Sequence, residues 1–187
     1  MSNKRTVSAA GLAFAGMMTA LVFVSNYLSI PTAFSRLHVA NAVCMLAGML
    51  FGGVRGGIIA GLGSALFDLT FPAYVAESWI TFINKGAMAL ACGLVVNDKQ
   101  NTFSRPVLAV IGSMTGAVLY ITLYLLKSYI QIRWVTPVPA ETVAPALVGK
   151  LSSSAINGLF AVIVAPLLYG ALYPALNKAG LYNHLRG

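Results

Sequence analysis

The chain alternates long apolar runs with short connections that are polar or contain glycine and proline. These runs predict helices at about 7–28, 39–52, 54–71, 79–96, 105–129 and 148–173. A helix needs roughly 20 residues to cross a bilayer, so the run at 39–52 is too short for a full span. It meets the next run through a glycine-rich turn at 52–57, which leaves a re-entrant hairpin as an alternative. The pattern predicts an all-α integral membrane protein with six transmembrane helices and one membrane domain, 1–187.

Composition and charge support this topology. With 58% hydrophobic and 9% charged residues, the chain has too little polar surface for a soluble globule. The net charge of +8 comes from short segments between apolar runs, which argues against a nucleic-acid-binding face. Six spans place most basic residues on one side: Lys4, Arg5, Arg55, Lys99, Arg105, Lys178 and Arg186. The positive-inside rule then predicts cytoplasmic N- and C-termini in a multi-pass membrane protein.

Three connections fall on the outer side: 29–38, 72–78 and 130–147. They gather charged and aromatic residues, namely Arg36, His38, Tyr74, Glu77, Trp79, Arg133, Trp134 and Glu141. The connection at 130–147 is the longest, and its prolines predict a stiff cover over a pocket. For Trp79 and Trp134, an aromatic belt at the level of the lipid headgroups is an equal alternative.

Polar residues within the apolar runs predict a pocket. Asp68 and Lys85 lie where a charge costs at least about 2.5 kcal/mol unless it is paired or hydrated. Polar stripes run along three helices: Glu77, Thr81 and Lys85; Lys150, Ser153, Ser154 and Asn157; and His38 with Asn41. Converging stripes predict an outward-facing substrate site, with the candidates Arg36, His38, Asn41, Asp68, Tyr74, Trp79, Lys85, Trp134 and Asn157. The alternative is a structural network in which Asp68 pairs with Lys85.

The first helix carries a strip of small residues. Ala9, Ala13, Gly16 and Ala20 recur at helical spacing, which lets another helix approach closely. The strip could pack internally or dock a partner chain, and Ala9, Ala13 and Gly16 are the candidate docking residues.

The sequence does not predict an enzyme. Gly61-Leu62-Gly63-Ser64-Ala65 is a poor match to the serine turn of intramembrane proteases, because no glycine follows the serine. The chain has no phosphate-binding Gly-x-x-x-x-Gly-Lys-Ser/Thr loop, so ATP-driven work must come from other chains. Cys44 and Cys92 stand singly in apolar runs, and we expect neither a metal site nor a cofactor of the chain's own.

Several segments in order resemble the S components of energy-coupling factor (ECF) transporters. They are Arg36-Leu37-His38-Val39-Ala40-Asn41-Ala42, the stretch 46–57, Gly61-Leu62-Gly63-Ser64-Ala65-Leu66-Phe67-Asp68-Leu69, and Thr81-Phe82-Ile83-Asn84-Lys85-Gly86-Ala87-Met88. The resemblance is strongest over about 36–96. It implies a subunit that captures a vitamin outside and delivers it by toppling in the membrane, docked on a transmembrane coupling subunit and two ATPases that use ATP and Mg²⁺. In that family the start of the first helix meets the coupling subunit, which here corresponds to Ala9, Ala13 and Gly16.

The resemblance leaves the substrate open. Cobalamin is favoured, because the long outer connection suits a bulky ligand. The alternatives are pyridoxine, hydroxymethylpyrimidine, a queuosine precursor, riboflavin or pantothenate. A self-sufficient secondary carrier is the competing class, although the two halves of the chain show no repeat.

Overall fold

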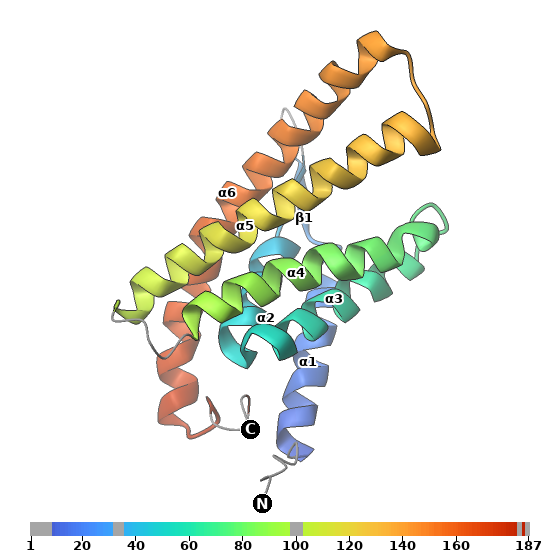
Figure 1. Cartoon of the computed structure of the whole chain (residues 1–187). Coiled ribbons are helices and arrows are strands. Elements are labelled where there is room, and N and C mark those ends of the chain that lie inside the picture. Colours follow the sequence, from blue (N-terminus) through green and yellow to red (C-terminus); the bar gives the residue numbers. More distant parts are fainter. Residues whose placement is uncertain (1–8, 32–35, 98–102, 183–184, 186–187) are drawn as a thin grey trace, which may run out of the picture.

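The computed structural model describes residues 9–31, 36–97, 103–182 and 185. Six helices dominate it, as the apolar pattern predicts: α1 Ala9–Ser25, α2 Ala40–Phe51, α3 Gly53–Leu69, α4 Ser78–Val96, α5 Arg105–Ile130 and α6 Ala140–Lys178. The start of α1 and the end of α6 lie at the same end of the bundle, as an even number of crossings requires (Figure 1).

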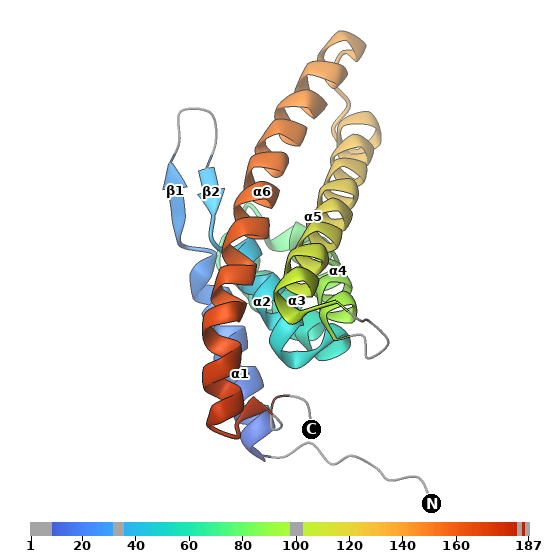
Figure 2. The same ribbon diagram turned by 90° about the vertical axis from the view of Figure 1, so that its left-hand side faces the viewer.

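A small hairpin interrupts the all-helical pattern. Strands β1 (Ser29–Pro31) and β2 (Arg36–His38) pair antiparallel, with Ser29 opposite His38. The sequence predicts this segment only as an outer connection. Three-residue strands are too short to show a period of two, so the hairpin leaves no signal in the apolar pattern. The hairpin stands beside α6 (Figure 2).

Helix α2 forms the centre of the molecule. All twelve of its residues are buried, and α1, α3, α4 and α6 pack around it. At about 1.5 Å per residue it is about 18 Å long, so it cannot cross a bilayer alone. Gly52, at a φ of +86°, makes the sharp turn into α3. A Cβ at Gly48 would overlap the carbonyl of Ala89, so glycine lets α2 lie directly against α4.

Helices α5 and α6 reach beyond the other four (Figure 1). The π-helical segment η2 (Gln131–Val135) extends α5, and α6 has 39 residues. That length corresponds to about 58 Å, well over the roughly 30 Å of a hydrocarbon core. The predicted long connection at 130–147 is therefore wrong, because only residues 136–139 separate the two helical segments. Pro145 lies inside α6, near its exposed start, instead of stiffening a loop.

Three helical segments are long and apolar enough to cross a membrane: Val75–Val96, Arg105–Val135 and Ala140–Lys178. The first joins the short 3-10 helix η1 (Val75–Glu77) to α4. Helices α1 and α2 are apolar but shorter. Large apolar side chains such as Leu159, Ile163 and Leu167 are more than half exposed on α6, as expected of a surface that faces lipid. The full count of six crossings stays a prediction.

Candidate functional site

A cavity with two chambers opens at the end of the bundle opposite the start of α1. The larger outer chamber has a volume of about 600 Å³ and lies between the ends of α1, α3, α4 and α5. The smaller inner chamber has a volume of about 200 Å³ and is bounded by β2, α2, α4, α5 and α6. The two share four wall residues: His38, Lys85, Tyr120 and Tyr124.

Aromatic rings form one wall of the outer chamber. Tyr27 at the end of α1 meets Phe67 edge-on, with the ring centroids 4.8 Å apart. Phe71 lies 5.0 Å from Phe67 and 6.1 Å from Tyr74, so the rings continue into the connection between α3 and α4. Such a wall offers a large apolar contact surface to a ligand ring.

Helix α5 supplies the opposite wall with two stacked tyrosines. The rings of Tyr120 and Tyr124 are nearly parallel, with centroids 6.0 Å apart. The sequence analysis missed both. A signal was present, because Tyr120, Tyr124, Lys127 and Gln131 recur at i, i+4, i+7 and i+11 on one helix face.

Lys85 lies where the two chambers meet. Its side chain is 8% exposed, and its ammonium donates a hydrogen bond to Oδ1 of Asn41 on α2. Its Nζ also lies 4.9 Å from the centre of the Tyr120 ring, which is a cation–π contact. Both partners are neutral.

Asp68 does not pair with Lys85. Its carboxylate lies near Thr81 and lines the outer chamber. Within the described part of the chain, the one ion pair joins Lys127 to Glu77. The structural pairing considered from the sequence is therefore wrong, because Asn41 from α2 occupies the position beside Lys85.

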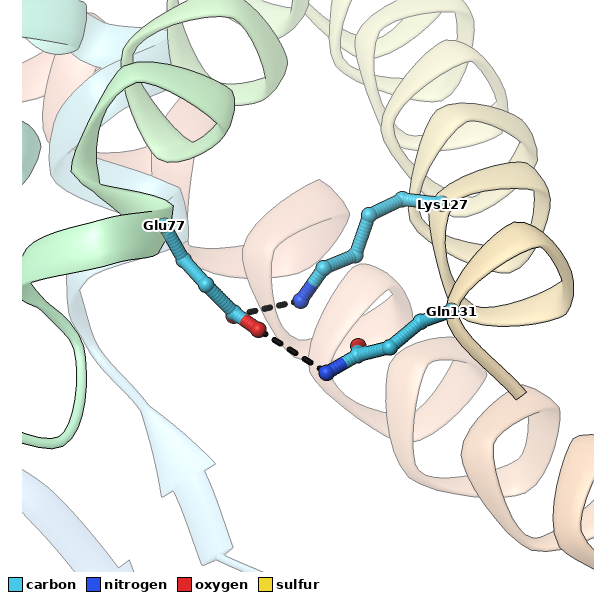
Figure 3. Close-up of polar contacts among 3 residues, drawn as sticks. All are labelled: Glu77, Lys127 and Gln131. Carbon is cyan, nitrogen blue, oxygen red and sulfur yellow. Dashed lines mark hydrogen bonds and ion pairs between the residues drawn. The ribbon is translucent and has the colours of Figure 1, made fainter. Parts of the chain in front are cut away.

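Glu77, Lys127 and Gln131 form a clasp across the outer chamber, from the end of η1 to α5 (Figure 3). Nζ of Lys127 lies 2.5 Å from Oε2 of Glu77, and the Gln131 amide donates to Oε1 at 3.0 Å. Glu77 and Lys127 both line the chamber, so the clasp ties the start of α4 to α5 at the cavity wall.

Asn157 of α6 holds the hairpin against the inner chamber. Its Oδ1 accepts a hydrogen bond from the backbone N–H of His38 at 2.6 Å, and its Nδ2 donates to the Ser153 carbonyl at 2.9 Å. Ser153 and Ser154 line the same chamber, and Nζ of Lys150 lies 5.6 Å from the Tyr124 ring centre. The polar stripe that contains Thr81 and Lys85 and the one that contains Ser153, Ser154 and Asn157 therefore meet at one cavity, as predicted.

Eight of the nine candidate site residues divide into two groups. Six of them line the cavity: His38, Asn41, Asp68, Tyr74, Lys85 and Asn157. Trp79 and Trp134 line neither chamber and are 63% and 65% exposed. Trp134 contacts Tyr129 near the tip of α5, which suits the belt alternative. The side chain of Arg36 lies outside what the structure describes. That the six cavity residues bind substrate stays a prediction.

The small-residue strip of α1 faces away from the bundle. The buried residues of α1 are Gly11, Met18, Val22 and Ser25, whereas Ala9, Ala13, Gly16 and Ala20 are exposed on the opposite side of the helix. Internal packing of the strip is therefore not what the structure shows. Gly16 and Ala20 border a crevice of about 470 Å³ between α1 and α3.

A family model described as "ECF-type riboflavin transporter, S component" matches residues 6–174, most of the chain. The chain belongs to the S-component family of ECF transporters. This S component is therefore a membrane-embedded transporter subunit and not an enzyme.

The fold agrees with that assignment. A solved structure described as "Structure and mechanism of the S component of a bacterial ECF transporter" matches with a TM-score of 0.63 and 21% identity. The match covers 89% of this S component and 96% of the solved chain. A "UPF0397 protein" of Lactiplantibacillus plantarum (strain ATCC BAA-793 / NCIMB 8826 / WCFS1) is 32% identical over 100 residues, which is 52% of this chain and 53% of that protein. The chain thus spans about half the length of that curated relative.

Proposed function

We propose that this S component captures a small, ring-containing micronutrient from outside the cell. The carrying observation is the two-chambered cavity, which pairs an aromatic outer wall with a polar inner chamber. Together the chambers fall within the roughly 300–1,000 Å³ typical of sites for small organic ligands. Aromatic walls supply contact area, and a few polar groups fix the orientation of the ligand.

The orientation of the chain makes this cavity accessible from outside. We propose six crossings of the bacterial cell membrane with both termini in the cytoplasm, because most basic residues then lie on the inner side. The cavity is bordered by the end of α1 and by the connection between α3 and α4. Both lie on the outer side in this topology.

Transport requires partner chains in this proposal. The sequence carries no phosphate-binding loop, so a transmembrane coupling subunit and two ATPases would supply the energy from ATP and Mg²⁺. The chain itself would need no cofactor. The exposed strip of Ala9, Ala13 and Gly16 supports α1 as the docking face, since it lets a partner helix approach closely.

The cavity supports best a ring-containing ligand of about the size of riboflavin, with polar groups at one end. The matching family model names riboflavin for the proteins it describes. The sequence favours cobalamin because it predicts a long outer connection. The connection between η2 and α6 contains only residues 136–139, so this reason for cobalamin no longer applies. Cobalamin and the other vitamins remain outcomes of the binding experiment.

The test combines binding and uptake. Purified full-length protein is examined by mass spectrometry for a retained small molecule, and proteoliposomes are assayed with and without the coupling subunit and ATPases. We expect the chain alone to bind its ligand without accumulating it, and the complete assembly to accumulate it with ATP. Gradient-driven accumulation by the lone chain would instead establish a secondary carrier.

A matched pair of variants tests the docking face. Ala13→Trp places a large ring on the strip, whereas Ala10→Trp places the same ring about a quarter turn away. We expect Ala13→Trp to abolish ATP-dependent uptake while ligand binding by the isolated chain survives. Ala10→Trp should retain most uptake. Loss of ligand binding in Ala13→Trp would show that the strip supports the fold and not a partner.

A further inference from the structure

The two chambers differ in the charge of their walls. The outer chamber is lined by the carboxylates Asp68 and Glu77 and by Lys127, besides Lys85, which it shares with the inner chamber. The inner chamber is lined by His38, Asn41, Lys85, Tyr120, Tyr124, Ser153, Ser154 and Asn157, which include no carboxylate. Its walls thus combine one lysine with hydroxyl, amide and ring groups.

Lys85 is a buried cation whose hydrogen-bond partner and cation–π partner are both neutral. Its ammonium carries three N–H donors, and the contacts found for it are one hydrogen bond to Asn41 and the face of Tyr120. With 8% of the residue exposed, water contributes little to its solvation. A buried charge gains most from an opposite charge that it also hydrogen-bonds. Among the described residues no carboxylate lies within salt-bridge distance of Lys85, and Asp68 interacts with it only at longer range.

Two other lysines near the cavity, Lys127 and Lys150, are placed differently from Lys85. Nζ of Lys127 forms an ion pair with Glu77 at 2.5 Å, so a ligand could bind Lys127 only by breaking the clasp. Lys150 lies against Tyr124, a wall residue of both chambers, but lines neither chamber itself. Within the described part of the molecule, Lys85 is therefore the one lysine that lines the inner chamber, and no carboxylate lines that chamber with it.

We infer that the inner chamber binds the anionic group of the substrate, a carboxylate or a phosphate, through Lys85. The substrate's ring then occupies the aromatic outer chamber, and Lys85 is the residue that selects acidic ligands over their neutral analogues. The inference rests on the proposed function, since it assigns a chemical class to the ligand of the same cavity.

Matched ligand pairs test this assignment. Riboflavin 5′-phosphate against riboflavin tests a phosphate, and pantothenate against pantothenol tests a carboxylate. Dissociation constants are measured by calorimetric titration of the purified full chain. A hydrogen bond to a charged group corresponds to a preference of about tenfold to a hundredfold for the acidic member of a pair. The pair that shows the preference distinguishes phosphate from carboxylate.

Two variants assign the preference to Lys85. Lys85→Met removes the charge and keeps much of the side-chain length. It should bring the dissociation constants of the two members of a pair within about threefold of each other, because the charged hydrogen bond is lost. Lys178→Met removes the same charge at the exposed end of α6, far from the cavity, and should keep the preference. Thermal unfolding of all three proteins checks that Lys85→Met is folded. If it is not, Lys85→Arg, which keeps the charge, should bind acidic ligands in preference.

The wild-type protein alone can overturn the inference. A neutral analogue that binds as tightly as its acidic partner, or a co-purified ligand without an acidic group, would refute it and leave the proposed function intact. A preference that survives in Lys85→Met would refute the role of Lys85. If no small molecule co-purifies and neither the two pairs nor the other vitamins named above bind, the proposed function fails together with this inference.

Discussion

Breaking the clasp between Glu77 and Lys127 should lower the free energy of unfolding. The interaction between the two side chains should appear as a measurable coupling energy in a double-mutant cycle. The clasp joins the end of η1 to α5, two segments that are 50 residues apart in the sequence. Glu77→Gln removes the negative charge and Lys127→Met removes the positive charge. Each single variant leaves the other charge without its partner, whereas the double variant removes both.

The magnitude follows from geometry and exposure. The ion pair is short, at 2.5 Å, and Gln131 adds a second hydrogen bond to the same carboxylate. The side chains of Lys127 and Glu77 are 20% and 33% exposed, so water screens the pair in part. Exposed pairs contribute about 0.2–1 kcal/mol, and hydrogen bonds to charged groups contribute about 1.5–3 kcal/mol. We therefore expect a coupling energy of about 1 kcal/mol, which should fall as salt is added.

A double-mutant cycle measures this coupling energy. Unfolding of wild type, both single variants and the double variant is followed in the same detergent at low and high salt. Glu77→Gln combined with Lys178→Met serves as the control, because these residues lie at opposite ends of the bundle and their effects should add. Additive effects for Glu77→Gln and Lys127→Met, with zero coupling at low salt, would refute a stabilising clasp.

Two further predictions test the placement of rings and the packing of glycines. Tyr120→Ala should weaken ligand binding by about 1–3 kcal/mol, which is about 5- to 150-fold in the dissociation constant from calorimetric titration. Trp79 is exposed outside the cavity, so Trp79→Ala should leave the affinity unchanged. The reverse result would place the site elsewhere. Gly48→Val should lower the free energy of unfolding by about 1–3 kcal/mol or more, because α2 and α4 touch at Gly48. Gly170 has open space around it, so Gly170→Val should be tolerated. Equal stability of the two variants in thermal unfolding would contradict this packing.

The sequence alone predicted the elements that depend on local chemistry. Apolar runs long enough for helices predicted all six, because each helix must cover its own backbone polar groups in a bilayer. The 3.6-residue period also predicted that Glu77, Thr81 and Lys85 share one face of α4, and that this face lines a cavity. The small-residue strip of α1 is a property of the same kind, since four small residues at helical spacing share a face wherever the helix lies, whereas the exposure of that face depends on the packing of the bundle.

Only the tertiary structure decided which side chains meet. The rotation of each helix about its axis is set by contacts between helices, such as Gly48 against Ala89, and these contacts leave no local signal. That rotation places Tyr120 in the cavity and leaves Trp79 exposed, and it brings Asn41 instead of Asp68 to Lys85. The sequence gives the spacing of residues along one helix. Pairings between helices arise from the packing of the whole bundle, because close approach at small residues fixes which faces come together.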